Sequence, residues 1–165
     1  MSAKARVIMV LVAILCVPAF SLTAAADDDP FMGNWKLNTK KSAGPAERRE
    51  MKSYTRKHEP IPNGMKVSRE EVDADGVVSH PYWTAKFDGK DHPLIGEPGG
   101  FVDSLYLKRL DKHTIVGGSK KNGLLINLLR WEVSEDGKYF FWRATRVNPP
   151  ELEGSVVVNV FEKQP

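Results

Sequence analysis

The chain has 165 residues, of which 41% are hydrophobic and 27% are charged. These values lie close to the globular average and exclude a wholly disordered chain or a fibrous repeat. The formal net charge is only +3, which is too small an excess for a dedicated nucleic-acid-binding protein, so no nucleic acid is expected as a partner. The length fits one domain of ordinary size.

The N-terminal residues have the features of a secretory signal peptide. Two basic residues precede the apolar residues 7–17, and Ala24-Ala25-Ala26 provides the small side chains that a signal peptidase requires. We therefore expect residues 1–26 to be cleaved, and residues 27–165 to form the mature domain in the periplasm or outside the cell. No stable membrane insertion is expected after cleavage. The alternative is an uncleaved anchor, for which the apolar run is short compared with a span of about 20 residues.

Turn signals recur through the rest of the chain at nearly even spacing. Asn-Gly and Asp-Gly pairs tolerate the positive φ angles that tight hairpins need. Such pairs occur at Asn63-Gly64, Asp75-Gly76, Asp88-Gly89, Asn122-Gly123 and Asp136-Gly137. A turn roughly every dozen residues leaves no room for crossover helices, so the sequence predicts an antiparallel up-and-down meander.

The segments between these turns have the composition of β-strands. They are residues 33–38, 51–59, 65–73, 77–87, 91–96, 104–110, 114–120, 124–134, 138–147 and 155–162. A meander of about eight to ten strands with two open edges invites aggregation, so we expect an all-β closed barrel. The apolar last strand is expected to pair with the strand that contains Trp35. Pro81 has no N–H to donate and predicts a bulge or an edge.

Gly33 and Trp35 resemble the Gly-x-Trp opening of the calycins, the superfamily of lipocalins and fatty-acid-binding proteins. The resemblance implies a lipocalin-like β-barrel. In this family the Gly lets the chain enter the first strand closely, and the Trp fills the closed end under a basic side chain. Lys163 and Arg146 are the two candidates for this basic partner.

Two short stretches carry a narrower resemblance. The residues Asp29-Pro30-Phe31, 35–38 and 41–42, followed by 87–91 and Pro93, are similar to small uncharacterised bacterial secreted lipocalin-like proteins. The helix pair that fatty-acid-binding proteins insert between their first two strands has no counterpart here.

Residues that carry catalysis or bind metals form no recognisable motif. The four histidines are dispersed, the single cysteine lies at position 16, and no Gly-x-Ser-x-Gly nucleophile elbow occurs. We therefore expect no enzyme, no metal and no cofactor. For an enzyme, His80 and Glu71 would be the least implausible pair of titratable groups at a barrel mouth.

Binding of a small apolar or amphipathic molecule is the function that the sequence favours. Arg69, Arg109 and Arg146 each share a strand face with apolar residues, and inside a barrel their guanidinium groups would hold an anionic end. The alternatives are pairing with an internal carboxylate such as Glu71, or a place at the wet rim. Aromatic residues would either line a cavity or fill the core. The aromatic candidates for ligand contact are Trp83, Phe87, Trp131 and Trp142.

The segment 124–129 is apolar on both faces, so a strand here would expose Leu124, Ile126 and Leu128 outside the barrel. Such a patch predicts a homodimer interface or another partner surface. The alternative function is therefore an envelope protein–protein interaction module with a filled barrel. The loop of residues 39–50 is another candidate to cover this patch.

Overall fold

The computed structural model describes residues 29–44, 51–95 and 101–165, so the expected signal segment lies outside the described residues. The described chain forms eleven β-strands and one short 3₁₀ helix, η2 (Pro150–Leu152). The strands are β1 (Gly33–Leu37), β2 (Ser53–Ile61), β3 (Gly64–Val72), β4 (Val78–Ser79), β5 (Tyr82–Lys86), β6 (His92–Ile95), β7 (Ser104–Arg109), β8 (Thr114–Lys121), β9 (Leu124–Val133), β10 (Tyr139–Arg146) and β11 (Val156–Gln164). Within these ranges no helix has the length and apolar character needed to cross a membrane.

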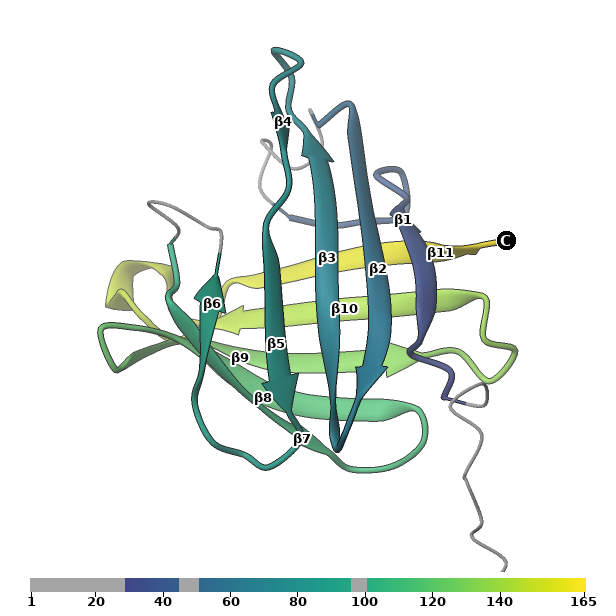
Figure 1. The fold of residues 1–165 in the computed structure, drawn as a ribbon. Helices are drawn as coiled ribbons and strands as arrows, with labels where there is room; N and C mark the ends of the chain where they lie inside the picture. Colours follow the sequence, from purple (N-terminus) through teal and green to yellow (C-terminus); the bar gives the residue numbers. More distant parts are fainter. Residues whose placement is uncertain (1–28, 45–50, 96–100) are drawn as a thin grey trace, which may run out of the picture.

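All strands belong to one antiparallel sheet in the order β2-β1-β11-β10-β9-β8-β7-β6-β5-β3-β4. Strand β2 also pairs with β3, so ten strands close into a barrel, while β4 extends beside β3 alone. Figure 1 shows β2, β3 and β5 crossing in front of β8 to β11, which is how a strongly twisted sheet closes on itself. The predicted all-β antiparallel barrel is confirmed.

Three local expectations can be followed in the strand pairing. Strand β11 pairs with β1, with Trp35 opposite Lys163. The segment predicted as one strand over residues 77–87 is split at Pro81 into β4 and β5. At the turn between β8 and β9, Asn122 and Gly123 have φ angles of 50° and 79°. Two successive positive φ angles characterise the two-residue hairpin turn that Asn-Gly favours.

Aromatic side chains packed around Phe140 fill one end of the barrel. The centroid of the Phe140 ring lies 5.4 Å from that of Phe161, 5.6 Å from that of Trp35 and 6.0 Å from that of Phe31. All four side chains are fully buried. Each aromatic pair at such distances contributes roughly 0.5–1.5 kcal/mol beyond the burial of its area. This aromatic cluster therefore closes the end of the barrel at which the described chain begins.

Gly33 and Trp35 hold the positions that the Gly-x-Trp resemblance implies. Gly33 has a φ angle of +113°, which L side chains rarely adopt, and a Cβ there would stand 3.2 Å from Cε of Lys163. The Nζ atom of Lys163 lies 5.2 Å from the centroid of the Trp35 ring. A cation at this distance from an aromatic face is attracted by it. Of the two candidate basic partners, Lys163 and not Arg146 therefore covers Trp35.

The exposed leucines of β9 match their prediction only in part, because a bulge opposite Ser119 and Lys120 offsets Leu124 from the outer face on which Leu128 lies. Leu124 and Leu128 are 57% and 46% exposed, whereas Ile126 is 6% exposed. The backbone N–H groups of Val147 and Asn148 donate to the carbonyl oxygen of Ile126, so the segment after β10 lies against this part of β9. The expected exposure of Ile126 is therefore wrong.

Residues 39–44 run beside β11 and not over β9. Ala43 forms an antiparallel bridge with Val158, and Oγ of Ser42 accepts the backbone N–H of Val160 at 2.9 Å. These contacts accompany the burial of Val160, which is 5% exposed. The remainder of the predicted loop, residues 45–50, lies outside the described residues.

The aromatic cluster predicts a large difference between two neighbouring phenylalanines. Phe140→Ala is expected to lower the free energy of unfolding by about 3–5 kcal/mol, because it leaves a cavity among buried rings. Phe141→Ala on the outward face of the same strand is the matched control and should lose less than half as much. Urea denaturation of both variants measures the difference, and equal losses would contradict the central packing role of Phe140.

Candidate ligand-binding site

A cavity of about 500 Å³ lies in the barrel beyond the aromatic cluster. Side chains from every barrel strand except β1 line it, together with Phe101 and Val102 from the chain before β7. Phe101 and Ser79 belong to the lining and are exposed, so the cavity reaches the surface at this end of the barrel. A volume of this size is typical of small-molecule sites, roughly 300–1,000 Å³.

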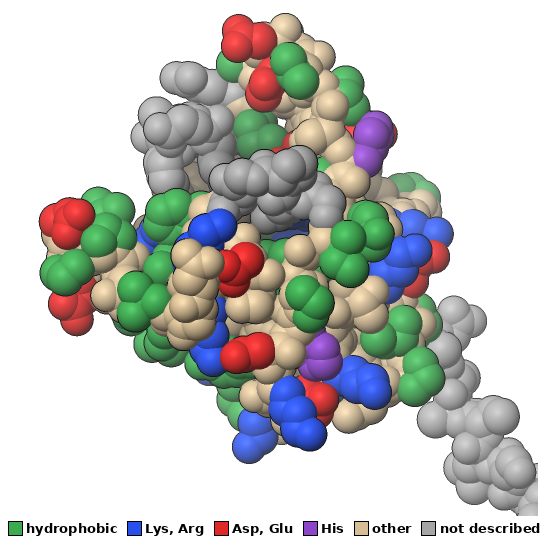
Figure 2. Space-filling model, turned by 60° about the vertical axis from the view of Figure 1, so that its left-hand side comes forward, with side chains coloured by type: hydrophobic (Ala, Val, Ile, Leu, Met, Phe, Trp, Pro, Cys, Tyr) green, Lys and Arg blue, Asp and Glu red, His purple; other side chains and the backbone are tan. Residues whose placement is uncertain are grey.

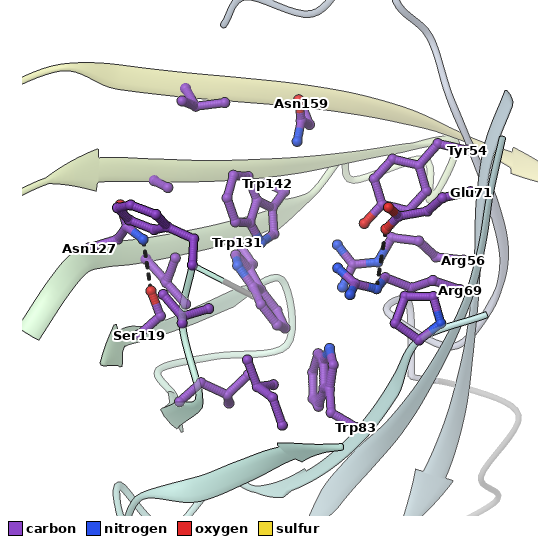
Figure 3. A pocket seen from close by; sticks show the side chains of 18 of the residues that line it. Tyr54, Arg56, Arg69, Glu71, Trp83, Ser119, Asn127, Trp131, Trp142 and Asn159 are labelled. Atoms are coloured by element: carbon purple, nitrogen blue, oxygen red, sulfur yellow. Dashed lines mark hydrogen bonds and ion pairs between the residues drawn. The ribbon is translucent and has the colours of Figure 1, made fainter. Parts of the chain in front are cut away.

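Two arginines face each other inside the barrel on neighbouring strands. Arg56 on β2 is the cross-strand partner of Arg69 on β3, and both line the cavity. Figure 3 shows their guanidinium groups beside each other and next to Glu71. Nε of Arg69 lies 3.4 Å from Oε1 of Glu71. Because like charges directly opposite each other destabilise a sheet, the pair needs nearby negative charge.

Arg56 lies at the boundary between the cavity and the aromatic cluster. Its side chain is 4% exposed. Its guanidinium carbon lies 5.3 Å from the centroid of Phe140, 5.4 Å from that of Phe161 and 5.5 Å from that of Trp131. Aromatic faces attract a cation, so these rings help to hold the Arg56 guanidinium at the base of the cavity.

Three tryptophans form the apolar middle of the cavity. Trp83, Trp131 and Trp142 all line it, and Figure 3 shows them between the arginine pair and the wall that carries Asn127. The centroids of the Trp83 and Trp131 rings are 5.7 Å apart. Large flat side chains of this kind bury an apolar ligand body with little loss of side-chain entropy.

A second polar group lies on the other wall, towards the mouth. Ser119, Asn127 and Arg146 are successive cross-strand partners on β8, β9 and β10. Nδ2 of Asn127 donates to Oγ of Ser119 at 2.8 Å. The guanidinium carbon of Arg146 lies 4.1 Å from the centroid of the Phe101 ring. Partial burial lowers the pKa of Arg146 from its usual value.

The structure gathers five of the seven predicted ligand-contact residues around the cavity. They are Arg69, Arg146, Trp83, Trp131 and Trp142. Arg109 and Phe87 lie elsewhere: Nη2 of Arg109 is 2.6 Å from Oδ2 of Asp29, and its guanidinium carbon is 4.8 Å from the centroid of Phe87 and 5.2 Å from that of Phe31. Arg109 therefore holds the start of the described chain against the closed end of the barrel.

Arg56, Tyr54 and two polar residues of the opposite wall, Ser119 and Asn127, line the cavity although the sequence does not single them out as ligand contacts. In β2 the residues Tyr54, Arg56 and His58 alternate with Thr55 and Lys57, so both faces carry polar groups and neither face stands out as apolar. Tyr54, Arg56 and His58 are all buried in the structure, so they form the inner face of β2. The alternation in the sequence separates the two faces but does not show which one is buried.

His58 is fully buried behind the arginine pair, at the edge of the aromatic cluster. Its Nδ1 is 2.9 Å from the carbonyl oxygen of Phe31, which also accepts the indole N–H of Trp35. Since a carbonyl only accepts, Nδ1 carries the proton. Burial holds the pKa of His58 well below its usual range, and the nearby Arg56 charge lowers it further. His58 is therefore a neutral part of the core.

Titratable residues do not gather as a metal centre in the part of the chain that the structure describes. No group of three or more His, Cys, Asp or Glu side chains is placed to hold a metal ion there. Glu71 lines the cavity, whereas His80 is exposed and borders a shallow groove on the outer side of β1, β2 and β3. The structure does not bring these two residues into one cavity.

On the face of the described chain shown in Figure 2, side chains of one charge are not concentrated. Acidic and basic side chains lie interspersed there among polar and hydrophobic ones. Many basic side chains are paired with a neighbouring acid, for example Lys41 with Glu162 at 3.0 Å and Lys120 with Asp91 at 2.7 Å.

No protein-family model matches the chain. No curated protein matches it in sequence. Among solved structures, a Schistosoma mansoni fatty acid binding protein in complex with arachidonic acid is similar, with a TM-score of 0.57 and 12% sequence identity. The match covers 84% of this chain and 98% of that chain. The fold is a closed antiparallel β-barrel like that of this fatty acid binding protein. At this identity the likeness concerns the arrangement of strands and not the residues inside the barrel.

The environment of His58 predicts a specific dependence of stability on pH. The usual pKa is 6.5 and the folded-state pKa lies well below it, so from about pH 6.5 downwards the unfolded chain binds a proton that the folded chain does not. The free energy of unfolding should therefore fall as the pH is lowered from 6.5 to 5, by at most about 1.4 kcal/mol per pH unit.

Denaturant unfolding at a series of pH values measures this slope. His58→Gln should flatten it in that window, whereas His80→Gln, which changes an exposed histidine, should leave it as in the unmodified protein. An unchanged slope in His58→Gln would contradict the neutral buried imidazole.

Proposed function

We propose that this protein binds a small amphipathic molecule, with the anionic group of the molecule at Arg56 and Arg69 and its apolar body among Trp83, Trp131 and Trp142. The observation that carries the proposal is the cross-strand arginine pair inside a cavity of about 500 Å³. A carboxylate or phosphate between the two guanidinium groups relieves their repulsion and forms charge-assisted hydrogen bonds.

The lining supports an anionic ligand more than a neutral one. Among the lining residues that the structure describes, Arg56, Arg69 and Arg146 supply three positive charges and Glu71 supplies the single negative charge. A buried cation is costly unless it is paired or hydrogen-bonded. A bound anion supplies the charge that the lining lacks, and this gain is part of its binding free energy.

The rest of the lining supports an apolar ligand body. Leu94, Leu105, Leu129, Ala144 and Val157 line the cavity between the tryptophans. Burial of apolar ligand surface contributes roughly 25 cal/mol per Å² before the costs of association. The similar barrel of known structure is described as a fatty acid binding protein in complex with arachidonic acid. A long-chain carboxylate is accordingly the first ligand class to test.

The proposal places this binding outside the inner membrane and without catalysis. The basic start and the apolar run of residues 7–17 support export, and small residues at 24–26 support cleavage. The separation of His80 from the cavity leaves the mouth without the acid–base pair considered for an enzyme. A binder would deliver or store its ligand in the periplasm or the extracellular space.

The second candidate is an interaction module or homodimer that uses the outer face of β9. The exposure of Leu124 and Leu128 favours it, because two large apolar side chains on one strand face water. With Ile126 buried, the apolar surface offered to a partner is smaller than the sequence predicts. This use of the outer face is compatible with a ligand inside the barrel.

Two substitutions, one in the arginine pair and one at the adjacent Glu71, should change the affinity for palmitate in opposite directions. Arg69→Met removes a charged donor and is expected to weaken binding about 10- to 100-fold, the equivalent of one charge-assisted hydrogen bond. Glu71→Gln removes the competing carboxylate and is expected to strengthen binding. The fluorescence of the cavity tryptophans measures both affinities.

The matched control is Arg143→Met, which removes an exposed arginine of β10 that pairs with Glu132 at 3.2 Å outside the barrel. This variant should bind palmitate as the unmodified protein does. Equal affinity of Arg69→Met and the unmodified protein, or weaker binding by Glu71→Gln, would overturn the assignment of the anion to the arginine pair.

A further inference from the structure

Among the described lining residues, Arg146 is the arginine that does not belong to the arginine pair and does not form the ion pair with Glu71. It lines the cavity at the mouth end of β10. Its Nη1 atom is buried without a hydrogen-bond partner, and among the described residues its guanidinium contacts the ring of Phe101 and no carboxylate. The cation is thus held partly buried in the wall with no counter-charge from the described chain.

Arg146 lies far from the arginine pair along the barrel. The guanidinium of Arg56 lies 5.3 Å from the ring of Phe140, near the start of β10. Arg146 is six residues further along the same strand, which corresponds to roughly 20 Å of extended chain. Trp142 and Ala144 follow Phe140 on the inner face of β10 and line the cavity before Arg146 does, so apolar side chains separate the positions of Arg56 and Arg146 along this strand.

The neighbours of Arg146 also suit an oxygen-rich group. Asn127 is its cross-strand partner, and Ser119 is the partner of Asn127 on the next strand. Asn127 is 9% exposed and Ser119 is 5% exposed. The Asn127 amide donates to Ser119 through one N–H only, so its second N–H and the hydroxyl hydrogen of Ser119 remain as donors beside Arg146.

We infer that the ligand carries two anionic groups, one at each end of an apolar body, and that Arg146 with Asn127 and Ser119 binds the second one. The inference rests on the proposed function and narrows its ligand class from amphipathic monoanions to linear dianions. The charges of the described lining residues agree with a dianion, because three arginines and one glutamate leave two positive charges there. A monoanion neutralises only one of them.

The test compares linear dicarboxylates, from decanedioate to octadecanedioate, with the monocarboxylate of the same length by isothermal titration calorimetry. In the unmodified protein the diacid should bind at least tenfold more tightly at the length that spans both sites. Arg146→Met should abolish this preference, so that diacid and monoacid of the same length bind with equal affinity. Arg143→Met, the exposed arginine on the same strand, should retain the preference.

Two outcomes of this comparison would overturn the inference. If no cationic group binds the second carboxylate at the mouth, burying that carboxylate costs free energy and weakens binding of the diacid. Diacids that bind no more tightly than monoacids at every length would therefore overturn the inference. This comparison needs only the unmodified protein and does not depend on how the variants fold. A diacid preference that persists in Arg146→Met would also overturn it.

The proposed function and the inference fail in different ways. Monoacid binding that depends on Arg69, without any diacid preference, contradicts the second site alone. Absence of binding for both acid series contradicts both proposals. An alkyl phosphate, whose single headgroup carries the two charges, provides the remaining comparison: tighter binding than any diacid, unchanged in Arg146→Met, would assign both charges to the arginine pair and overturn the inference.

Discussion

Two guanidinium groups that face each other inside a closed barrel are the constraint around which the rest of the cavity is arranged. Arg56 and Arg69 occupy opposite positions on β2 and β3, where like charges repel. Glu71 compensates part of this charge, and the rings of Phe140 and Phe161 stabilise Arg56 from the other side. A sequence selected only for stability would place apolar side chains here, because a well-packed apolar core is at least as stable as a buried ionic cluster.

The two ends of the barrel differ: one is closely packed, and the other contains the open cavity with its charged groups. At one end the aromatic cluster is packed without solvent access, and Lys163 over Trp35 and Arg109 against Asp29 secure the chain around it. At the other end the lining residues leave about 500 Å³ open and hold charged groups against it. Close packing at the first end supplies stability that the open cavity at the second end does not. Substitutions at the two ends should accordingly separate effects on stability from effects on affinity.

The regular features of the barrel could be derived from the sequence, and the interior charges only in part. Asn-Gly turns and short alternating segments fix an antiparallel meander, and closure follows from the cost of open edges. The apolar residues that alternate with Arg69 and Arg146 along their strands correctly predict that both arginines face the inside of the barrel. Arg56 lies in a strand with polar residues on both faces, so its orientation depends on pairing with β1 and β3. Arg109 also lies on the strand face that its apolar neighbours predict. It is not in the cavity lining, because its guanidinium pairs with Asp29 near the closed end of the barrel.

The most direct test of a ligand-binding barrel is native mass spectrometry of the protein purified without detergent from its own host. The account predicts added mass that disappears on denaturation, belongs to an acidic amphipathic molecule, and is absent from an Arg56→Met, Arg69→Met double variant. The denatured mass also shows whether the chain begins at Asp27. A dimer without added mass would favour the outer face of β9, and a protein without added mass that also binds no carboxylate in titration would contradict the central claim.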